Sequence, residues 1–384
     1  MSPESPRPAA DPAAPVLHFV VGTRAQLIKM APVIAEAERR GVPHRRWSTG
    51  QHVETVQDLR AEFGIERDWV ELSQGGEVGG LGRVLPWMIG VTWRLVRQLR
   101  ERVRAEPSTR HWVVVHGDTF STLIGALAGR ICGCRVAHVE SGLSSGNWRH
   151  PFPEELTRRA VFRLMHLALC PGPKPAAHLA GRRGVTVIDT GENTLLDTTR
   201  LALDAIAAGR STGGPPCVVC SIHRFENVFN AGRLSRIVDI VLELADSHEV
   251  RFVLHPVTRR QLARHDQMRR LEAHDRVQLV PRMTYLPFIR LCAGARFVVS
   301  DGGSNQEELA YLRIPTVLMR DATERDQGLD SGLTLISQLD ASKVRDFVAG
   351  LPAAPGDRSE PLAEYRDLWP SRQILDALSG AEPG

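Results

Sequence analysis

Three carboxylates occupy positions in the sequence where acid–base chemistry is expected. Asp118 follows the short apolar segment Trp112–Val115, Glu140 follows Val136–Val139, and Glu154 opens a helix after two prolines. Short β-branched runs of this kind are typical of strands buried on both faces of a parallel sheet. Ligands of open α/β sheets bind beyond the carboxyl ends of the strands, and acids gathered there are costly to desolvate. We therefore predict that all three carboxylates are catalytic.

Each carboxylate also has a purely structural interpretation. Asp118 could cap the helix expected over Thr119–Arg130, and Glu154 with Glu155 could complement the dipole at a helix start. The structural interpretation is weakest for Glu140, because an acid that directly follows a buried strand is costly to keep there. Taken together, the three acids favour the catalytic interpretation.

A fourth catalytic candidate, His223, lies at the end of the apolar strand expected over Cys217–Ile222. A single histidine at a strand end is more often structural. Its expected position in a second domain, opposite the three acids, favours a catalytic role here.

Two turns are suited to phosphate groups. The first, Gly22-Thr23-Arg24, joins the strand expected over Val16–Val21 to a helix and puts Arg24 and Lys29 at the rim of the helix N-terminus. Backbone amides and the helix dipole favour anions there. The turn lacks the spacing of a Walker or GxGxxG motif, so it is a weak signal by itself.

The second turn follows the strand expected over Phe297–Ser300 and is rich in glycine. Glycines at the start of a helix allow backbone amides to approach phosphate oxygens closely. A downstream acid could take the ribose hydroxyls and an arginine the phosphate charge. The residues assigned to this turn and its neighbours are Gly302, Gly303, Ser304, Glu308 and Arg325.

The composition is that of a soluble globular protein. The 384 residues are 42% hydrophobic and 24% charged, and the formal net charge is only +4. This balance, with aromatic residues at 5%, gives no support to a nucleic-acid partner. The longest apolar stretch is too short to span a bilayer. The six cysteines are expected to be buried free thiols, as suits a cytoplasmic protein.

Alternating strand and helix patterns predict an α/β chain of two doubly wound, Rossmann-like domains that face each other across a cleft. That arrangement suggests a nucleotide-sugar enzyme more than a dehydrogenase. The expected organisation is a disordered tail at 1–15, an N-terminal domain at 16–208, a linker at 209–216, a C-terminal nucleotide-binding domain at 217–358, and a C-terminal helix and tail at 359–384. We also expect a mobile loop at 75–82, a long helix over about 86–105 and a helical tail over 359–379.

The residues at these positions resemble the UDP-N-acetylglucosamine 2-epimerase family, whose fold is glycosyltransferase-B-like. The matching segments span nearly all of the chain outside its tails, in the family's order. They are GTRAQLIKMAPVI (22–34), TGQH (49–52), VHGDT (115–119), HVESGL (138–143), PFPEELTRR (151–159), SIHRFENV (221–228), YLPF (285–288), SDGGSNQEELA (300–310) and MRDATER (319–325).

The resemblance implies an elimination and re-addition that needs no metal or redox cofactor. Removal of the C2 proton of UDP-GlcNAc and loss of UDP from C1 would give 2-acetamidoglucal, and re-addition with protonation on the other face would give UDP-ManNAc. The family's acids map onto Asp118, Glu140 and Glu154, and its histidine maps onto His223. Substrate contacts would map onto Arg24, Lys29, Gln51, Arg224, Phe288, Gly302, Gly303, Ser304, Glu308 and Arg325. We also expect a homodimer.

Several departures from the family pattern keep other functions open. They are Ala25-Gln26 in place of the usual Pro-Glu, Ser144 where arginine is common, Gly302 where a serine is expected, and an extra Glu192. Another NDP-sugar, a hydrolysing variant that releases free ManNAc, and a glycosyltransferase on the same fold therefore stay as alternatives. A non-catalytic sugar-nucleotide sensor is more distant, because a sensor need not keep three buried acids.

Overall fold

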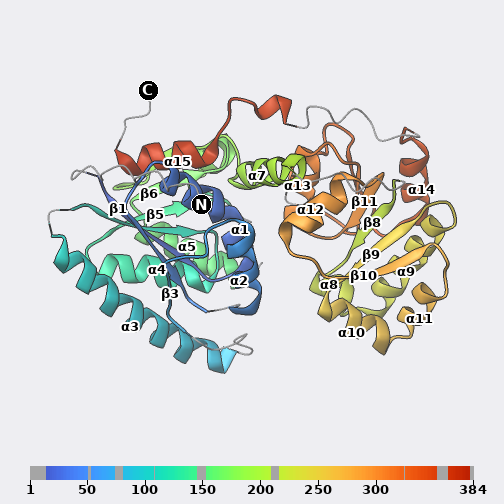
Figure 1. The fold of residues 1–384 in the computed structure, drawn as a ribbon, viewed down its shortest axis with the longest axis horizontal. Coiled ribbons are helices and arrows are strands. Elements are labelled where there is room, and N and C mark those ends of the chain that lie inside the picture. The colour runs from blue at the N-terminus through green and yellow to red at the C-terminus, as the bar shows by residue number, and fades with distance from the viewer. Residues whose placement is uncertain are drawn as a thin grey trace, which may run out of the picture. The chain divides into compact units, whose positions relative to one another are not determined.

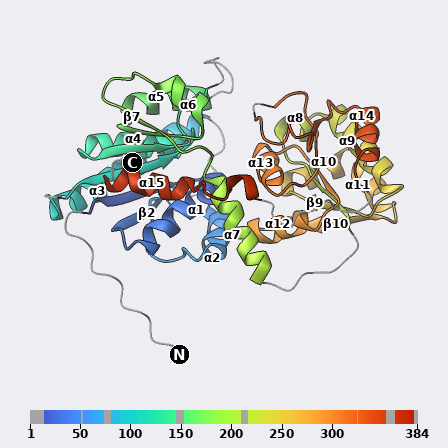
Figure 2. The same cartoon turned by 90° about the horizontal axis from the view of Figure 1, so that it is seen from above.

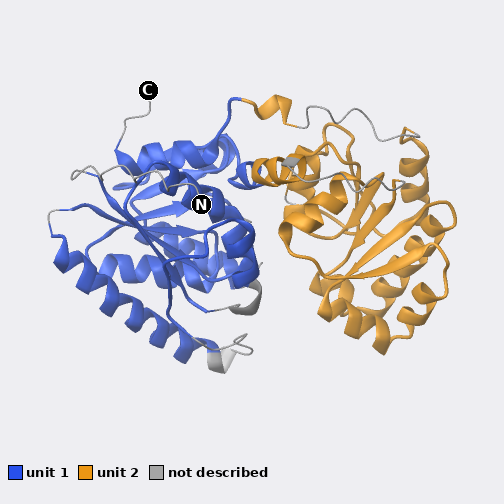
Figure 3. Cartoon of the chain, viewed as in Figure 1, with its two compact units in different colours: residues 1–198, 367–384 blue, residues 199–366 orange. Residues whose placement is uncertain are grey.

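The chain forms two compact units (Figure 3). The structure, a computed structural model, describes residues 14–50, 53–73, 81–107, 109–144, 153–208, 216–323, 325–352 and 362–380. Unit 1 comprises residues 1–198 and 367–384, and unit 2 comprises residues 199–366. The division falls inside helix α7 (Leu195–Ala208), whereas residues 209–215 of the predicted linker lie outside the described residues. The domain bounds given by the sequence stay a prediction.

Unit 1 is built on a seven-stranded parallel sheet (Figure 1). Its strands are β1 (Val16–Val21), β2 (His44–Ser48), β3 (Trp69–Glu71), β4 (His111–His116), β5 (Arg135–Val139), β6 (Leu167–Cys170) and β7 (Thr186–Asp189). Their order across the sheet is β3-β2-β1-β4-β5-β6-β7. The central strands β1 and β4 are buried along their whole length, as expected of parallel strands covered on both faces.

Helices cover both faces of this sheet (Figure 2). They are α1 (Arg24–Arg39), α2 (Val53–Glu62), α3 (Leu81–Ala105), α4 (Phe120–Ile131), α5 (Glu154–Leu164), α6 (Pro173–Leu179), the first part of α7, and α15 (Pro370–Ser379). Right-handed crossovers put α3, α4 and α5 side by side on one face and α1 and α2 on the other. Helix α15 returns from the C-terminus to pack on α1, where Asp376 pairs with Arg40 at 2.5 Å.

Unit 2 repeats the plan with a six-stranded parallel sheet in the order β10-β9-β8-β11-β12-β13. The strands are β8 (Val218–Ser221), β9 (Val250–Leu254), β10 (Val277–Pro281), β11 (Phe297–Ser300), β12 (Thr316–Leu318) and β13 (Thr334–Ile336). The helices that accompany them, after the end of α7, are α8 (Phe225–Val228), α9 (Ala231–Ala245), α10 (Pro256–Arg264), α11 (Gln267–Glu272), α12 (Tyr285–Ala293), α13 (Gly303–Tyr311) and α14 (Ala341–Ala349), with a 3-10 turn at Ala363–Tyr365.

In each sheet the strand order reverses at one point. In unit 1 the reversal lies between β1 and β4, and in unit 2 it lies between β8 and β11. The chain leaves the two strands of each pair in opposite directions, which opens a crevice at their carboxyl ends where ligands of this fold bind. The turns that follow these four strands carry Arg24, Asp118, His223 and Gly302. The topology therefore puts predicted site residues at both reversal points.

Some elements differ from the sequence-based expectation. Helix α3 begins at Leu81, not near residue 86, so the end of the loop expected at 75–82 is helical, while residues 75–80 lie outside the described part. Strands β3 and β13 were not predicted. Within the helical tail expected over 359–379, the described part contains only a 3-10 turn and α15. In the part of the chain that the structure describes, no helix is both long and apolar enough to cross a membrane.

Candidate active site

Glu140 is the centre of a buried charged cluster at the end of β5. Its side chain is 9% exposed, and its Oε1 accepts hydrogen bonds from Lys29 Nζ at 2.5 Å and Asn193 Nδ2 at 2.6 Å. Its Oε2 lies 3.1 Å from Nε2 of His116 at the end of β4. The backbone of Glu140 has a φ of +59°, a left-handed conformation that costs a non-glycine residue of order 1–2 kcal/mol. Such strain is concentrated at functional sites, where the surrounding structure enforces it.

Two histidines beside Glu140 are held neutral. Burial lowers the pKa of His116 to about 3, and the opposing effect of the Glu140 charge does not overcome it. Burial likewise lowers the pKa of His138 to about 4. The Nε2 of His138 bonds the carbonyl oxygen of Gly117 at 2.7 Å, which fixes the turn between β4 and α4. The carboxylate of Glu140 therefore lies beside a neutral His116 ring at Oε2 and the Lys29 ammonium at Oε1.

Asp118 is paired with an arginine of α5, so the capping interpretation is wrong. Thr119 is the N-cap of α4 and makes no side-chain cap bond, whereas Asp118 accepts a charge-assisted hydrogen bond from Arg158. Arg158 also donates to Glu155 at 2.6 Å. The Glu155 side chain is fully buried, and Arg159 contacts it at 3.3 Å. This chain of alternating charges joins the β4 turn to α5.

Glu154 lies in the first turn of α5. Its Oε2 is buried and has no hydrogen-bond partner among the residues that the structure describes. An unsatisfied buried acceptor costs about 1–3 kcal/mol, and such a group in a native structure calls for an explanation. A substrate hydroxyl or amide would satisfy this oxygen. The structure gives no contact that joins Glu154 to Asp118 or Glu140.

Gln26, one of the departures from the family pattern, organises the first turn. Its Oε1 accepts the backbone amides of Gly22 and Thr23 at 2.9 and 3.2 Å, and Thr23 in turn caps Gln26 to complete a capping box. Its Nε2 donates to the carbonyl oxygen of His116 at 2.7 Å. An ionised glutamate could not make that last bond, because it has no donor. The amide thus ties the turn after β1 to the end of β4.

In unit 2, His223 is positioned by an aspartate that the sequence analysis did not single out. Asp301 is fully buried at the end of β11. Its carboxylate accepts the backbone amides of His223 and Arg224 at 3.0 Å each, and Nδ2 of Asn227 at 3.0 Å. Nδ1 of His223 lies 3.4 Å away, and the ring stacks on His255 with centroids 4.6 Å apart. The His223 side chain is 37% exposed, so it is available to a ligand.

The glycine-rich turn after β11 is closely packed against two side chains. A Cβ on Gly302 would lie 3.1 Å from Cε1 of His223, and one on Gly303 would lie 2.8 Å from Nε of Arg325. Arg325 is held there by an ion pair with Glu307. The His223 ring therefore approaches Gly302 at the point where a serine side chain would begin.

The other predicted substrate residues fall in several places. Glu308 is buried in α13, where burial and then the Glu308 charge raise the pKa of Tyr285 well above its usual value. Arg24, Arg224, Phe288 and Ser304 are half-buried. Gln51 lies outside the described residues.

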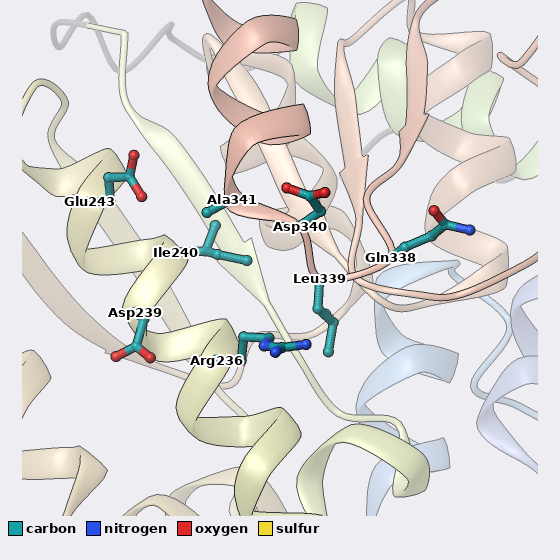
Figure 4. Close-up of a pocket in the computed structure, with 8 residues that line it drawn as sticks. All are labelled: Arg236, Asp239, Ile240, Glu243, Gln338, Leu339, Asp340 and Ala341. Carbon is teal, nitrogen blue, oxygen red and sulfur yellow. The ribbon is translucent and has the colours of Figure 1, made fainter.

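A cavity of about 570 Å³ lies in unit 2 away from all of these residues (Figure 4). It lies between α9 and the segment 338–341 that leads into α14. Two of its three acids are already paired, Asp239 with an arginine at 2.7 Å and Glu243 with another at 2.5 Å. This cavity is therefore not the predicted site.

The described part of the chain contains no cluster of three or more histidines, cysteines or carboxylates with the geometry of a metal site. All six cysteines are free, and five of them are buried, as expected; Cys132 is half-buried.

Comparisons with known proteins identify the family of this chain. The family model for UDP-N-acetylglucosamine 2-epimerase matches residues 35–379. The chain belongs to this family. A relative from Yersinia pestis, a UDP-N-acetylglucosamine 2-epimerase, is 29% identical over 377 residues, which is 94% of this chain and 97% of the relative. Another, from Salmonella borreze, is 30% identical over 337 residues and covers 83% and 85% of the two chains.

Solved structures of the 2-epimerase family show the same fold. The UDP-GlcNAc 2-epimerase from Methanocaldococcus jannaschii superposes with a TM-score of 0.75 at 23% identity, over 94% of this chain and 99% of that one. The enzyme from Neisseria meningitidis, bound to UDP-GlcNAc, gives 0.74 at 25% identity over the same shares. The predicted fold class, two doubly wound α/β domains of the glycosyltransferase-B-like kind, is confirmed.

Sequence reasoning missed four residues that contact the predicted catalytic groups, namely His116, Arg158, Asn193 and Asp301. Asp301 offered a signal, because it directly follows the apolar run at 297–300 as Glu140 follows its own strand. Asn193 offered none, because its contact with Glu140 joins residues that are 53 positions apart.

Proposed function

We propose that this chain interconverts UDP-GlcNAc and UDP-ManNAc by elimination and re-addition of UDP. A base removes the proton from C2 as the C1–O bond to UDP breaks, which gives 2-acetamidoglucal and UDP. UDP oxygen then re-adds to C1 while C2 takes a proton on the opposite face. The substrate and the product are isomers with the same oxidation state, so the reaction consumes no oxidant, reductant or water.

The observation that carries this proposal is the environment of Glu140. A weakly acidic C–H needs a positioned base, and Glu140 is buried, strained and fixed by Lys29 and Asn193. We assign proton transfer at C2 to this carboxylate. Asp118 or Glu154 supplies the second acid–base group that inversion at C2 requires.

Most of the phosphate contacts are assigned to unit 2. The amides at the start of α13 and the guanidinium of Arg325 beside Gly303 suit a diphosphate that gains charge as it leaves. Glu308 is assigned to the ribose hydroxyls, and Arg24 with Lys29 to the phosphate side in unit 1. The relatives' structures bound to UDP-GlcNAc or UDP support a UDP-sugar as the substrate.

We also propose that the chain forms a homodimer in the cytoplasm. Support comes from helix α3, on which Leu85, Ile89 and Trp93 are 63%, 62% and 61% exposed. Their four-residue spacing puts them on one face of the helix. A contiguous apolar face of this kind marks an interaction surface.

Incubation of the full chain with UDP-GlcNAc in D2O tests the activity. We expect UDP-ManNAc to form and deuterium to enter C2 of both recovered sugar nucleotides, as seen by NMR. Free ManNAc as the product would establish the hydrolysing variant instead. Unlabelled sugar nucleotide together with transfer to an acceptor would establish a glycosyltransferase.

A further inference from the structure

A second cavity, of about 250 Å³, lies within unit 1 and is lined by none of the predicted site residues. One wall is the face of α5 that carries Arg159 and Arg163, which are one helical turn apart. The other wall is formed by His178 of α6 and by Arg182 just beyond that helix. Three arginines, all exposed to solvent, therefore line a small open pocket.

The charge of this pocket is not balanced by its own lining. Glu155 is its only acid, and both oxygens of that fully buried carboxylate are already bonded. Ser144 Oγ donates to Oε1 at 2.7 Å and Arg159 approaches the same oxygen at 3.3 Å, while Arg158 holds Oε2 at 2.6 Å. With three arginines against one carboxylate, the lining carries a net charge of about +2 at neutral pH.

Arg163 and Arg182 have no carboxylate partner among the described residues. Arg163 Nη1 donates to the carbonyl oxygen of Arg159 at 3.3 Å, and Arg182 Nη1 donates to that of Phe162 at 2.8 Å. The Arg182 guanidinium also lies over the Phe162 ring, 5.5 Å from its centroid. These contacts orient both arginines but leave their charges uncompensated.

We propose that this pocket is a second ligand site, which binds a phosphate group. The planar fork of arginine donors matches phosphate oxygens, and several arginines from two walls can share one phosphate. The volume is below the roughly 300–1,000 Å³ typical of drug-sized ligands, so the occupant is small. Inorganic phosphate and a sugar phosphate both have the required chemistry.

The site goes beyond the proposed epimerase reaction. Its residues come from α5 and α6, whereas the nucleotide phosphates are assigned to the turns after β1 and β11. Ser144 lines the pocket at a position where the family resemblance gives arginine. An arginine there would fill part of the pocket, whereas the shorter serine leaves it open.

Titration calorimetry with inorganic phosphate tests the site in the full chain. UDP is present in excess, so that phosphate cannot report on a nucleotide site. We compare wild type with Arg163→Gln, Arg182→Gln and the double variant, and use Arg183→Gln as the matched control. Arg183 is exposed, adjacent in sequence and carries the same charge, but does not line the pocket.

We expect one phosphate per chain to bind the wild type. A hydrogen bond to a charged group is worth about 1.5–3 kcal/mol, so each single variant should weaken binding roughly tenfold or more, and Arg183→Gln less than twofold. Among the described residues, Arg163 is hydrogen-bonded only within its own helix, so we expect Arg163→Gln to fold normally. Weaker phosphate binding by this variant would then reflect the loss of a ligand contact. Thermal unfolding checks that the variant is as stable as the wild type.

No binding to the wild type at millimolar phosphate, unchanged binding in the double variant, or an equal loss in Arg183→Gln would each overturn the proposal. These outcomes are independent of epimerase activity and of UDP affinity, so they do not depend on the proposed function. A parallel titration with N-acetylglucosamine 1-phosphate identifies the source. Tighter binding than inorganic phosphate assigns the site to a sugar phosphate, and equal or weaker binding assigns it to free phosphate.

Discussion

At the scale of single residues, two acids that directly follow strands are held by their surroundings in different ways. Glu140 sits after β5 in a left-handed conformation, and Asp301 sits fully buried after β11. Glu140 is fixed by side chains, Lys29 and Asn193, while Asp301 mainly fixes the backbone that carries His223. The first arrangement suits a group that reacts, and the second suits a group that positions another.

The positioning role of Asp301 predicts the effect of Asp301→Asn. The new amide group would face N–H donors of His223, Arg224 or Asn227, so at least one buried donor loses its acceptor, at about 1–3 kcal/mol of unfolding free energy. Turnover should fall strongly in the wild-type background but little further in a His223→Asn background, because the two act as a unit. Steady-state rates and urea unfolding measure both. The control Asp321→Asn, at an exposed acid, should change neither. Additive losses in turnover would show that Asp301 acts other than through His223.

At the scale of elements, the central strands of unit 1 carry buried histidines that are neutral in the folded state. Burial lowers the pKa of His18 in β1 to about 3, of His116 in β4 to about 3 and of His138 in β5 to about 4. In the unfolded chain each returns to about 6.5. Between these values the unfolded state binds more protons, so stability is fully present above about pH 6.5 and is lost as the pH falls toward 4.

His18→Gln tests this linkage away from the predicted catalytic groups. Each such histidine adds about 1.4 kcal/mol per pH unit to the slope of unfolding free energy in that window. The free energy of unfolding can be measured with urea at several pH values between 7.5 and 4.5. Plotted against pH, it should have a smaller slope in the variant than in the wild type, by about 1.4 kcal/mol per pH unit. His18 contacts His111 and Trp47, so the variant is also expected to be less stable at every pH. An unchanged slope would contradict the buried neutral state of His18.

At the scale of the whole molecule, the apolar face of α3 predicts self-association. Ile89→Glu places a charge in the middle of that face and should convert a dimer to a monomer, as measured by sedimentation velocity at micromolar concentration. Ile131→Glu is the control, because Ile131 is 51% exposed at the end of α4 and should leave the dimer intact. A monomeric wild type, or a dimeric Ile89→Glu variant, would contradict the proposal.

The sequence could predict most of the fold because its strands are apolar, β-branched runs that end in glycine or polar turns. The bounds of β1 and β11 agree with those expected. Strands β3 and β13 were missed, since each has three residues at the edge of a sheet and lacks such a run. The strand ends could be located from the sequence, and with them the acids that follow these strands. The side chains that pair with the acids could not be predicted. Arg158 reaches Asp118 across 40 residues, and only the packing of α5 against α4 brings them together.

Glu140 is proposed to exchange the proton at C2 of a UDP-sugar. The most direct test is the rate of deuterium entry at C2 of UDP-GlcNAc in D2O, measured for the wild type and for Glu140→Gln, with UDP affinity measured by calorimetry for both. Acid–base groups are worth about 10²–10⁴-fold in rate, so exchange should fall by that factor in the variant while UDP affinity stays near that of the wild type. Exchange at the wild-type rate in Glu140→Gln would contradict the account.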